Sequence, residues 1–252
     1  MANPIYIKYK RPNSRQIQSD SGRRFLLRRA VVQWLLKRGE APDSIGFDVP
    51  TGLASDRSDI AALWSSPVRI EKRNILMPHK SLVVVCALDR KECYAASVNP
   101  DALVNEMRYI KRRLTAIEEK IREEEPHLRD SHSLFEEYAD WDYEHSTNEE
   151  YHACRKREKE ISEKLYRGTR MERIQRNNIA NELYVAIPEG IIFPDEVMPG
   201  WGIITVSEEY IARLERKAPE REASQDAQLH LAQKIAAANR DYLTAALGIK
   251  KR

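Results

Sequence analysis

Hydrophobic positions near the start of the chain recur with helical spacing. They are separated by one, three and four residues, which places them on one stripe of an amphipathic helix. The positions on this stripe are Phe25, Leu26, Ala30, Val31, Trp34 and Leu35. Gly39 predicts the end of this helix, and Pro42 prevents it from resuming.

Three apolar runs follow, and each is too short for a helix. The runs are residues 45–49, 60–64 and 82–88. We expect three strands here, with a loop through Pro67 and Pro78 between the second and the third. The last run is an almost continuous series of aliphatic residues, which is typical of a central strand buried on both faces.

From Asp101 to about Arg176 the composition changes, and apolar residues step by three or four among dense charges. These residues are Leu103, Met107, Ile110, Leu114, Ile117 and Ile121. A second charged stretch spans residues 151–166, and an acidic, aromatic segment at 134–141 joins the two. The pattern predicts an antiparallel helical hairpin. Such long charged helices usually serve as scaffolding or as interaction arms.

Strand character returns after this hairpin. Residues 183–187 and 203–206 predict two neighbouring strands, and a final amphipathic helix is expected from Ala227 to Leu243. The order of elements predicts an α/β fold, with a mixed central sheet flanked by helices and interrupted by the inserted antiparallel helical hairpin. We expect residues 1–100 and 167–252 to build the sheet domain and residues 101–166 to form the insertion.

Composition places the chain among charge-rich globular proteins, because 42% of its 252 residues are hydrophobic and 32% are charged. Three cysteines share no metal-ligand spacing, and their odd number favours a reducing compartment. The first residues lack the apolar core of a secretory signal, and no apolar run approaches the roughly 18 residues that span a bilayer. We therefore expect a cytoplasmic protein without membrane contact.

The distribution of charge is more informative than the net charge of +3. The first 40 residues contain ten lysines and arginines but only two acids, Asp20 and Glu40. Such an excess favours binding to phosphate backbones. A solvated basic helix face explains it equally well.

One acid stands where packing gives no reason for it. Asp59 directly precedes the apolar strand 60–64, and Asp89 and Lys91 follow the third strand. Carboxylates on adjacent strands can bind Mg²⁺, and a lysine can orient water or stabilise charge on a phosphodiester. Asp89 and Lys91 would share a face if that strand runs through Leu88. The alternatives are a turn-capping Asp59 and a polar turn that ends the strand.

Several segments together resemble a known family. Residues 58–63, 82–89, 182–190 and 199–204 are similar to the restriction-endonuclease-like PD-(D/E)XK superfamily, particularly its small repair-associated MmcB-like branch. The resemblance covers roughly residues 20–95 and 165–220. It implies a sheet with helices on both sides, DNA as the ligand, Mg²⁺ as the cofactor and a role in DNA repair or processing.

The resemblance also implies site residues. The first motif aspartate falls on Asp59. The second motif is degenerate: aligned by the strand, its acid and lysine fall near Val85 and Ala87, and only a shift to Asp89 and Lys91 leaves a catalyst. Catalysis would then use Asp59, Asp89 and Lys91, with Asp59 and Asp89 as metal ligands. The predicted nucleic-acid-binding residues are Arg23, Arg24, Arg28, Arg29, Arg170, Arg173, Gln175 and Arg176.

Two functions therefore remain open. The first is a DNA-binding protein that either cleaves DNA as a Mg²⁺-dependent deoxyribonuclease or has lost cleavage. The second is a catalytically inactive nuclease-like protein whose helical arm binds a protein partner or self-associates. The inserted hairpin departs from the small branch of the family in either case.

Overall fold

The computed structural model describes residues 19–52, 56–70, 72–96, 98–129 and 141–249. The chain divides into two compact units. One unit comprises Met1–Cys93 and Arg170–Arg252, and the other comprises Tyr94–Thr169. We call the second unit the arm.

The first unit contains one six-stranded sheet in the order β1-β2-β3-β4-β5-β6. Its strands are β1 (Ser44–Pro50), β2 (Arg57–Ile70), β3 (Arg73–Cys86), β4 (Glu182–Pro188), β5 (Gly202–Val206) and β6 (Ala212–Arg216). The first three strands are antiparallel, β3, β4 and β5 are parallel, and β6 is again antiparallel. The predicted mixed α/β sheet is confirmed, and β6 is an additional edge strand.

Three helices belong to this unit, namely α2 (Asp20–Leu36), α5 (Arg170–Arg176) and α6 (Gln225–Ala246). Leu27, Val31 and Leu35 of α2 pack with Ile60 and Val84 of the sheet. α6 lies against β1, β2 and β3. At Gly46 of β1, an added Cβ would lie 3.1 Å from the Ile235 side chain of α6. Helices therefore flank the sheet, as expected.

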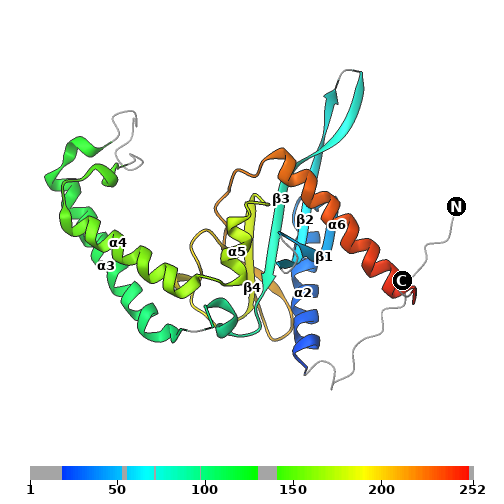
Figure 1. The fold of residues 1–252 in the computed structure, drawn as a ribbon, viewed down its shortest axis with the longest axis horizontal. Coiled ribbons are helices and arrows are strands. Elements are labelled where there is room, and N and C mark those ends of the chain that lie inside the picture. The colour runs from blue at the N-terminus through cyan, green and yellow to red at the C-terminus, as the bar shows by residue number, and fades with distance from the viewer. Residues whose placement is uncertain (1–18, 53–55, 71, 97, 130–140, 250–252) are drawn as a thin grey trace. The chain divides into compact units, whose positions relative to one another are not determined.

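The expected loop through Pro67 and Pro78 is wrong, because both prolines lie inside strands. β1 pairs with β2 only up to Leu63, and β4 pairs with β3 only from Leu82. Residues 65–70 and 73–78 pair with each other alone, and we call them the outer ribbon. The two prolines are tolerated because both outer edges are open. Figure 1 shows the outer ribbon as a cyan hairpin that extends beyond the other strands.

The arm consists mainly of α3 (Pro100–Glu124) and α4 (Glu149–Tyr166). Glu106 of α3 pairs with Arg157 at the middle of α4, and Arg113, further along α3, pairs with Glu150 at the start of α4, each at 2.6 Å. The two helices are therefore antiparallel, and the predicted helical hairpin is confirmed. Most of the predicted connecting segment lies outside the described residues. Short 3₁₀ turns complete the chain: η1 (Arg90–Cys93), η2 (Pro126–Leu128), η4 (Tyr143–His145) and η5 (Pro194–Glu196).

None of the helices in the described part of the chain combines the length and apolar character needed to cross a membrane. The three cysteines, Cys86, Cys93 and Cys154, are buried and free.

Candidate functional site around Asp59

The carboxylate of Asp59 is fully buried at the start of β2 and is hydrogen-bonded through both oxygens. Arg28 donates to Oδ1 from Nε at 2.9 Å and from Nη2 at 2.6 Å. The Cys86 amide donates to Oδ2 at 2.8 Å, and Nη2 of Arg170 donates to the same oxygen. A buried carboxylate persists in its charged form only with such partners. Asp59 is thus the centre of a cluster of arginines.

Two helices position these arginines. Arg24 and Arg28 lie one turn apart on α2, so their side chains project from the same face. Arg24 donates through Nη1 to the Cys86 carbonyl. Its Nη2 donates to both carboxylate oxygens of Glu92, and each of these two distances is 2.8 Å. Arg170, the first residue of α5, also donates to the Cys86 carbonyl, at 3.2 Å. The last residue of β3 is therefore held through both its amide and its carbonyl.

Further acids surround this centre. Arg28 also binds Asp48 of β1 at 2.7 Å, and Arg173 binds Asp56 at 2.6 Å. Asp48 has a positive φ of 49°, a conformation that aspartate tolerates better than most residues. The cluster pairs four arginines with four carboxylates: Arg24, Arg28, Arg170 and Arg173 with Asp48, Asp56, Asp59 and Glu92. Its formal charge is therefore zero.

The cluster shifts the pKa of its members. Burial lowers the pKa of Arg28, but the Asp59 and Asp48 carboxylates raise it by more, so the net shift is upward. Burial, together with the negative charge of Asp59, raises the pKa of the Cys86 thiol well above its ordinary value. The Arg28 guanidinium therefore stays charged at physiological pH, and the Cys86 thiol stays protonated.

The structure does not place Asp89 and Lys91 on the strand. β3 ends at Cys86, so the expectation of a strand through Leu88 is wrong. Asp89 accepts a hydrogen bond from the Glu92 amide at 3.1 Å, and Lys91 lies in the 3₁₀ turn η1. This is the capping role that the sequence left open for a polar turn at the end of the strand.

The register of β2 and β3 favours the other alignment of the second motif. Ile60 is paired with Val84, so one further residue along the antiparallel register sets Asp59 opposite Val85. Directly opposed residues share a face of the sheet. The neighbour of Asp59 on its own face is thus an aliphatic side chain.

These residues do not fit a Mg²⁺ ion. Both oxygens of Asp59 already accept hydrogen bonds, and two of its partners are cations that compete with a metal. Across the described ranges, no three His, Cys, Asp or Glu side chains are grouped so that they could hold a metal ion. The described side chains around Asp59 therefore offer no ligand set for magnesium.

The other predicted nucleic-acid-binding residues lie on the same two helices. Arg23 pairs with Asp20 at 3.1 Å, and Arg176 pairs with Glu172, each within its own helix. Arg29 is exposed on α2. Gln175 has a buried side-chain oxygen without a hydrogen-bond partner in the described part of the chain. The structure thus brings Arg24, Arg28 and Arg170 onto Asp59 and its strand neighbour Cys86.

Sequence reasoning did not identify Asp48 and Glu92 as partners of these arginines. The spacing of Arg24 and Arg28 by four residues was a usable signal for a shared face. The contact between Arg170 and Asp59 spans 111 residues, so no local pattern reveals it.

A cleft of about 390 Å³ opens at the carboxyl ends of the parallel strands. Leu88 follows β3, Glu189 follows β4 and Ser207 follows β5, and Arg23 of α2 completes the lining. Ligands of open α/β sheets commonly bind outside the carboxyl ends of the strands. The position of this cleft in the fold is therefore that of a binding site, beside the helix that supplies Arg24 and Arg28.

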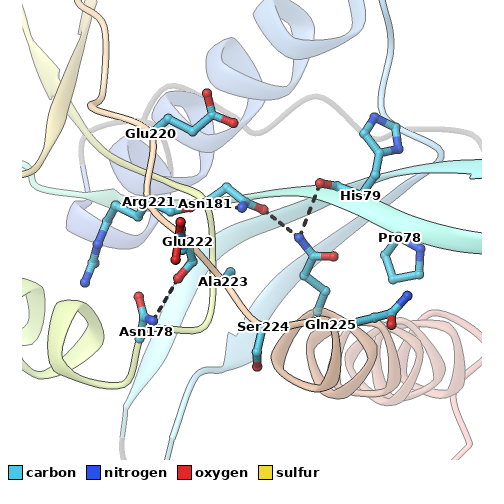
Figure 2. Close-up of a pocket in the computed structure, with 11 residues that line it drawn as sticks. Pro78, His79, Asn178, Asn181, Glu220, Arg221, Glu222, Ala223, Ser224 and Gln225 are labelled. Carbon is cyan, nitrogen blue, oxygen red and sulfur yellow. Dashed lines mark hydrogen bonds between the residues drawn. The ribbon is translucent and has the colours of Figure 1, made fainter.

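A second, more open cavity of about 820 Å³ lies at the N-terminus of α6. Figure 2 shows Asn181 beside it, accepting a hydrogen bond from Gln228, whose amide also reaches the His79 carbonyl. The same Asn181 oxygen accepts from the amide and the hydroxyl of Ser81, at 2.9 and 2.8 Å. These bonds join β3, α6 and the residue before β4. The buried polar side chains of Ser81, Asn181 and Gln228 therefore satisfy one another and stabilise the fold.

Comparisons with known proteins add little to this geometry. No family model matches the chain, and no curated protein matches it. Among solved structures, a Silicibacter pomeroyi protein of unknown function is similar, with 14% identity, a TM-score of 0.41 and 87% of each chain covered.

Proposed function

We propose that the protein binds DNA through the phosphate backbone and that Asp59 holds an arginine cluster in place instead of holding a metal ion. The first unit would then be a restriction-endonuclease-like core with a degenerate second motif. The resemblance stated from the sequence supports this core assignment, since it places the first motif at Asp59. Asp59 fixes the partly exposed Arg170 guanidinium, and this fixed guanidinium supports contact with an anion.

Arg170 is the observation on which this proposal rests. Both of its hydrogen bonds in the described structure use Nη2, and its side chain is 33% exposed. Nε and Nη1 are therefore left to donate to a ligand. A guanidinium already fixed by a carboxylate loses less conformational entropy when it binds a phosphate oxygen. Asp59 would pre-organise Arg170 for that contact.

Binding to a fluorescent duplex, measured by anisotropy over a range of KCl in EDTA, tests the proposal. We expect affinity to fall with salt, with a log–log slope of about −0.9 for each phosphate contact. Arg170→Gln should weaken binding to all sequences alike and make the slope shallower by about 0.9. Arg170→Lys keeps the positive charge, so the salt dependence of its DNA affinity should stay close to that of the wild type.

Arg240→Gln is the matched control, because Arg240 is exposed on α6, pairs with Asp241 and is not one of the predicted binding residues, while its substitution removes the same charge. A flat salt dependence would argue against DNA binding. Equal effects of Arg170→Gln and Arg240→Gln would remove Arg170 from the interface. Circular dichroism and urea unfolding of each variant separate lost binding from lost folding.

Mg²⁺-dependent DNA cleavage stays a prediction, and a nuclease assay tests it directly. Linear, nicked and single-stranded DNA are incubated with Mg²⁺ or Mn²⁺, and we expect the DNA to stay intact. Cleavage that disappears in Asp59→Asn, with binding retained, would show that Asp59 is a metal ligand after all. Asparagine is preferred to alanine here because it keeps the volume of the side chain and one acceptor for the arginines.

The compactness of the arm favours the second candidate function, in which the arm binds a protein partner or self-associates. The apolar stripe of α3 and that of α4 are buried within residues 94–169, which form a unit of their own. We propose this arm as an interaction module. Light scattering of the whole chain over a range of concentrations tests self-association, and a strictly monomeric protein would leave only a separate partner.

A further inference from the structure

We infer that the outer ribbon, residues 65–70 and 73–78, inserts into the major groove of duplex DNA. This inference rests on the proposed DNA binding but concerns a different surface from the arginine cluster. The outer ribbon was expected to be a loop, and none of the predicted binding residues lies on it.

The dimensions of the outer ribbon fit a groove. Its two strands of six residues each are paired only with one another, so neither outer edge is paired with a further strand. At about 3.3 Å per residue the ribbon is roughly 20 Å long. The major groove of B-form DNA, about 12 Å wide, admits a two-stranded ribbon. An isolated two-stranded ribbon is only marginally stable in water, so its extension beyond the sheet calls for a partner.

The charge of the outer ribbon fits the same partner. Arg69, Lys72 and Arg73 lie at its tip, where all three are exposed. None of the three forms an ion pair with another described residue, whereas Arg23, Arg24 and Arg28 of α2 each do. Between positions 65 and 80 the sequence contains one acid, Glu71, against the four basic residues Arg69, Lys72, Arg73 and Lys80, so the segment keeps an excess of positive charge. These three cations are therefore available to phosphates without breaking an internal pair.

One face of the outer ribbon combines the side chains that read bases. Arg69 is directly paired with Asn74, so both lie on the same face, as does the neighbouring pair of Pro67 and Leu76. Arginine forms bidentate hydrogen bonds with guanine, asparagine does so with adenine, and apolar side chains contact the methyl group of thymine. Leu76 is 71% exposed, which leaves it open for such a contact.

The arrangement of charges favours DNA over a membrane or RNA. A hairpin that inserts into a bilayer needs apolar residues at its tip, but here the tip is charged, and the exposed Val68 and Ile75 lie further back. Double-stranded RNA has a deep and narrow major groove that side chains do not read. The ribbon therefore matches B-form DNA best.

Variants of the whole chain test this inference. Arg69→Gln, Lys72→Gln and Arg73→Gln are combined, and DNA binding is measured over a range of salt. We expect the log–log slope to become shallower by about 1.8, which corresponds to the two phosphate contacts of Lys72 and Arg73. The matched control combines Arg112→Gln, Lys156→Gln and Lys159→Gln, which removes three exposed cations from the arm. The control should bind like the wild type.

Base contact is measured separately by protection of guanine N7 from dimethyl sulfate, since N7 lies in the major groove. We expect protection by the wild type and its loss in the combined variant Arg69→Ala and Asn74→Ala. No protection by a protein that binds duplex DNA would overturn the groove assignment.

The outcomes distinguish the two proposals. If the wild type does not bind DNA, the proposed function fails and this inference fails with it. If the wild type binds and the ribbon triple variant binds equally well, only the ribbon is excluded. If that variant loses binding to phosphatidylserine vesicles but keeps its DNA affinity, the ribbon is a membrane element and the inference is wrong.

Discussion

Arg28 and Asp59 are 31 residues apart in sequence, yet Nη2 of Arg28 lies 2.6 Å from Oδ1 of Asp59. Asp59 is fully buried and Arg28 is 20% exposed, so solvent screens this pair only weakly. We expect Arg28→Met to lower the free energy of unfolding by about 3 kcal/mol. This value is at the lower end of the cost of breaking a buried ion pair, because the Asp59 carboxylate keeps its hydrogen bonds from Arg170 and from the Cys86 amide.

Urea unfolding measures this loss. Arg23→Met on the same helix is the control, since within the described ranges Arg23 pairs with the exposed Asp20 alone, and the variant should lose less than about 0.5 kcal/mol. Equal midpoints for the two variants would contradict a stabilising role for the Arg28–Asp59 pair. The same pairing makes Asp59→Ala a poor test of metal binding, because it leaves Arg28 and Arg170 without their carboxylate.

Alkaline pH should destabilise the protein through two cysteines. Burial raises the pKa of Cys93 to about 12 and that of Cys86 well above its ordinary value. Unfolded thiols lose their protons near pH 9, so the folded state holds more protons above that pH. Stability is then complete below about pH 8 and should fall above pH 9 by up to roughly 1.4 kcal/mol per pH unit for each thiol.

Unfolding in urea at several pH values between 7 and 10.5 tests this dependence. Lys and Tyr titrate in the same range, so the double variant Cys86→Ala and Cys93→Ala is the reference. A wild type and a reference that lose stability equally between pH 9 and 10.5 would rule out the cysteines as the cause.

Asn181→Ala should destabilise the sheet at the junction of β3 and α6. One side-chain oxygen of Asn181 accepts three hydrogen bonds, two from Ser81 and one from Gln228 at 2.8 Å. Its loss leaves buried donors without partners, and we expect about 3 kcal/mol less stability. Combining it with Ser81→Ala should cost less than the sum of the single changes, since the two residues share bonds. Strict additivity would show that they act independently.

Gly202→Ala should destabilise the protein because β5 has no room for a Cβ there. The added carbon would lie 2.6 Å from the backbone nitrogen of Ala218 and would overlap the Tyr184 ring. Overpacking of this kind typically costs about 1 to 3 kcal/mol. Gly39→Ala is the control, because an added Cβ meets nothing within 4 Å. Thermal unfolding compares the two, and an unchanged midpoint for Gly202→Ala would disprove the close approach.

Residues 94–169 should fold when produced alone. Their buried side chains belong to α3, α4 and the turns beside them, and the ion pair of Arg113 with Glu150 at 2.6 Å lies within the same unit. We expect a helical circular dichroism spectrum and a cooperative thermal transition. A fragment without a transition would show that the arm depends on the sheet unit for its stability.

The apolar runs in the sequence predicted the inner halves of β2 and β3 because burial leaves a continuous pattern there. The outer ribbon was missed for a physical reason: its polar and apolar residues follow no regular alternation, and they include two prolines, which indicate a loop. β6 was missed because its sequence, from Ala212 to Arg216, is charged and lies at the edge of the sheet.

The candidate site was predicted in part. The sequence located Asp59 at the head of β2, because an acid before an apolar strand has no packing role. It could not show that Arg28 and Arg170 would occupy the carboxylate, since these contacts depend on how α2 and α5 return to the sheet. The absence of a charge at Val85 was the only local indication that a metal ligand was missing.

The parallel pairing of β3 with β4 has a consequence for synthesis of the chain on the ribosome. Ser81 and Asn181, which join the two strands, are separated by 100 residues. At about 5 to 20 residues per second, the ribosome makes that stretch in about 5 to 20 seconds. Throughout this interval the edge of Leu82–Cys86 that will pair with β4 has no partner strand. The helices of the arm can form from local contacts during this interval. The arm should therefore fold after the antiparallel strands β1 to β3 and before β4 joins the sheet.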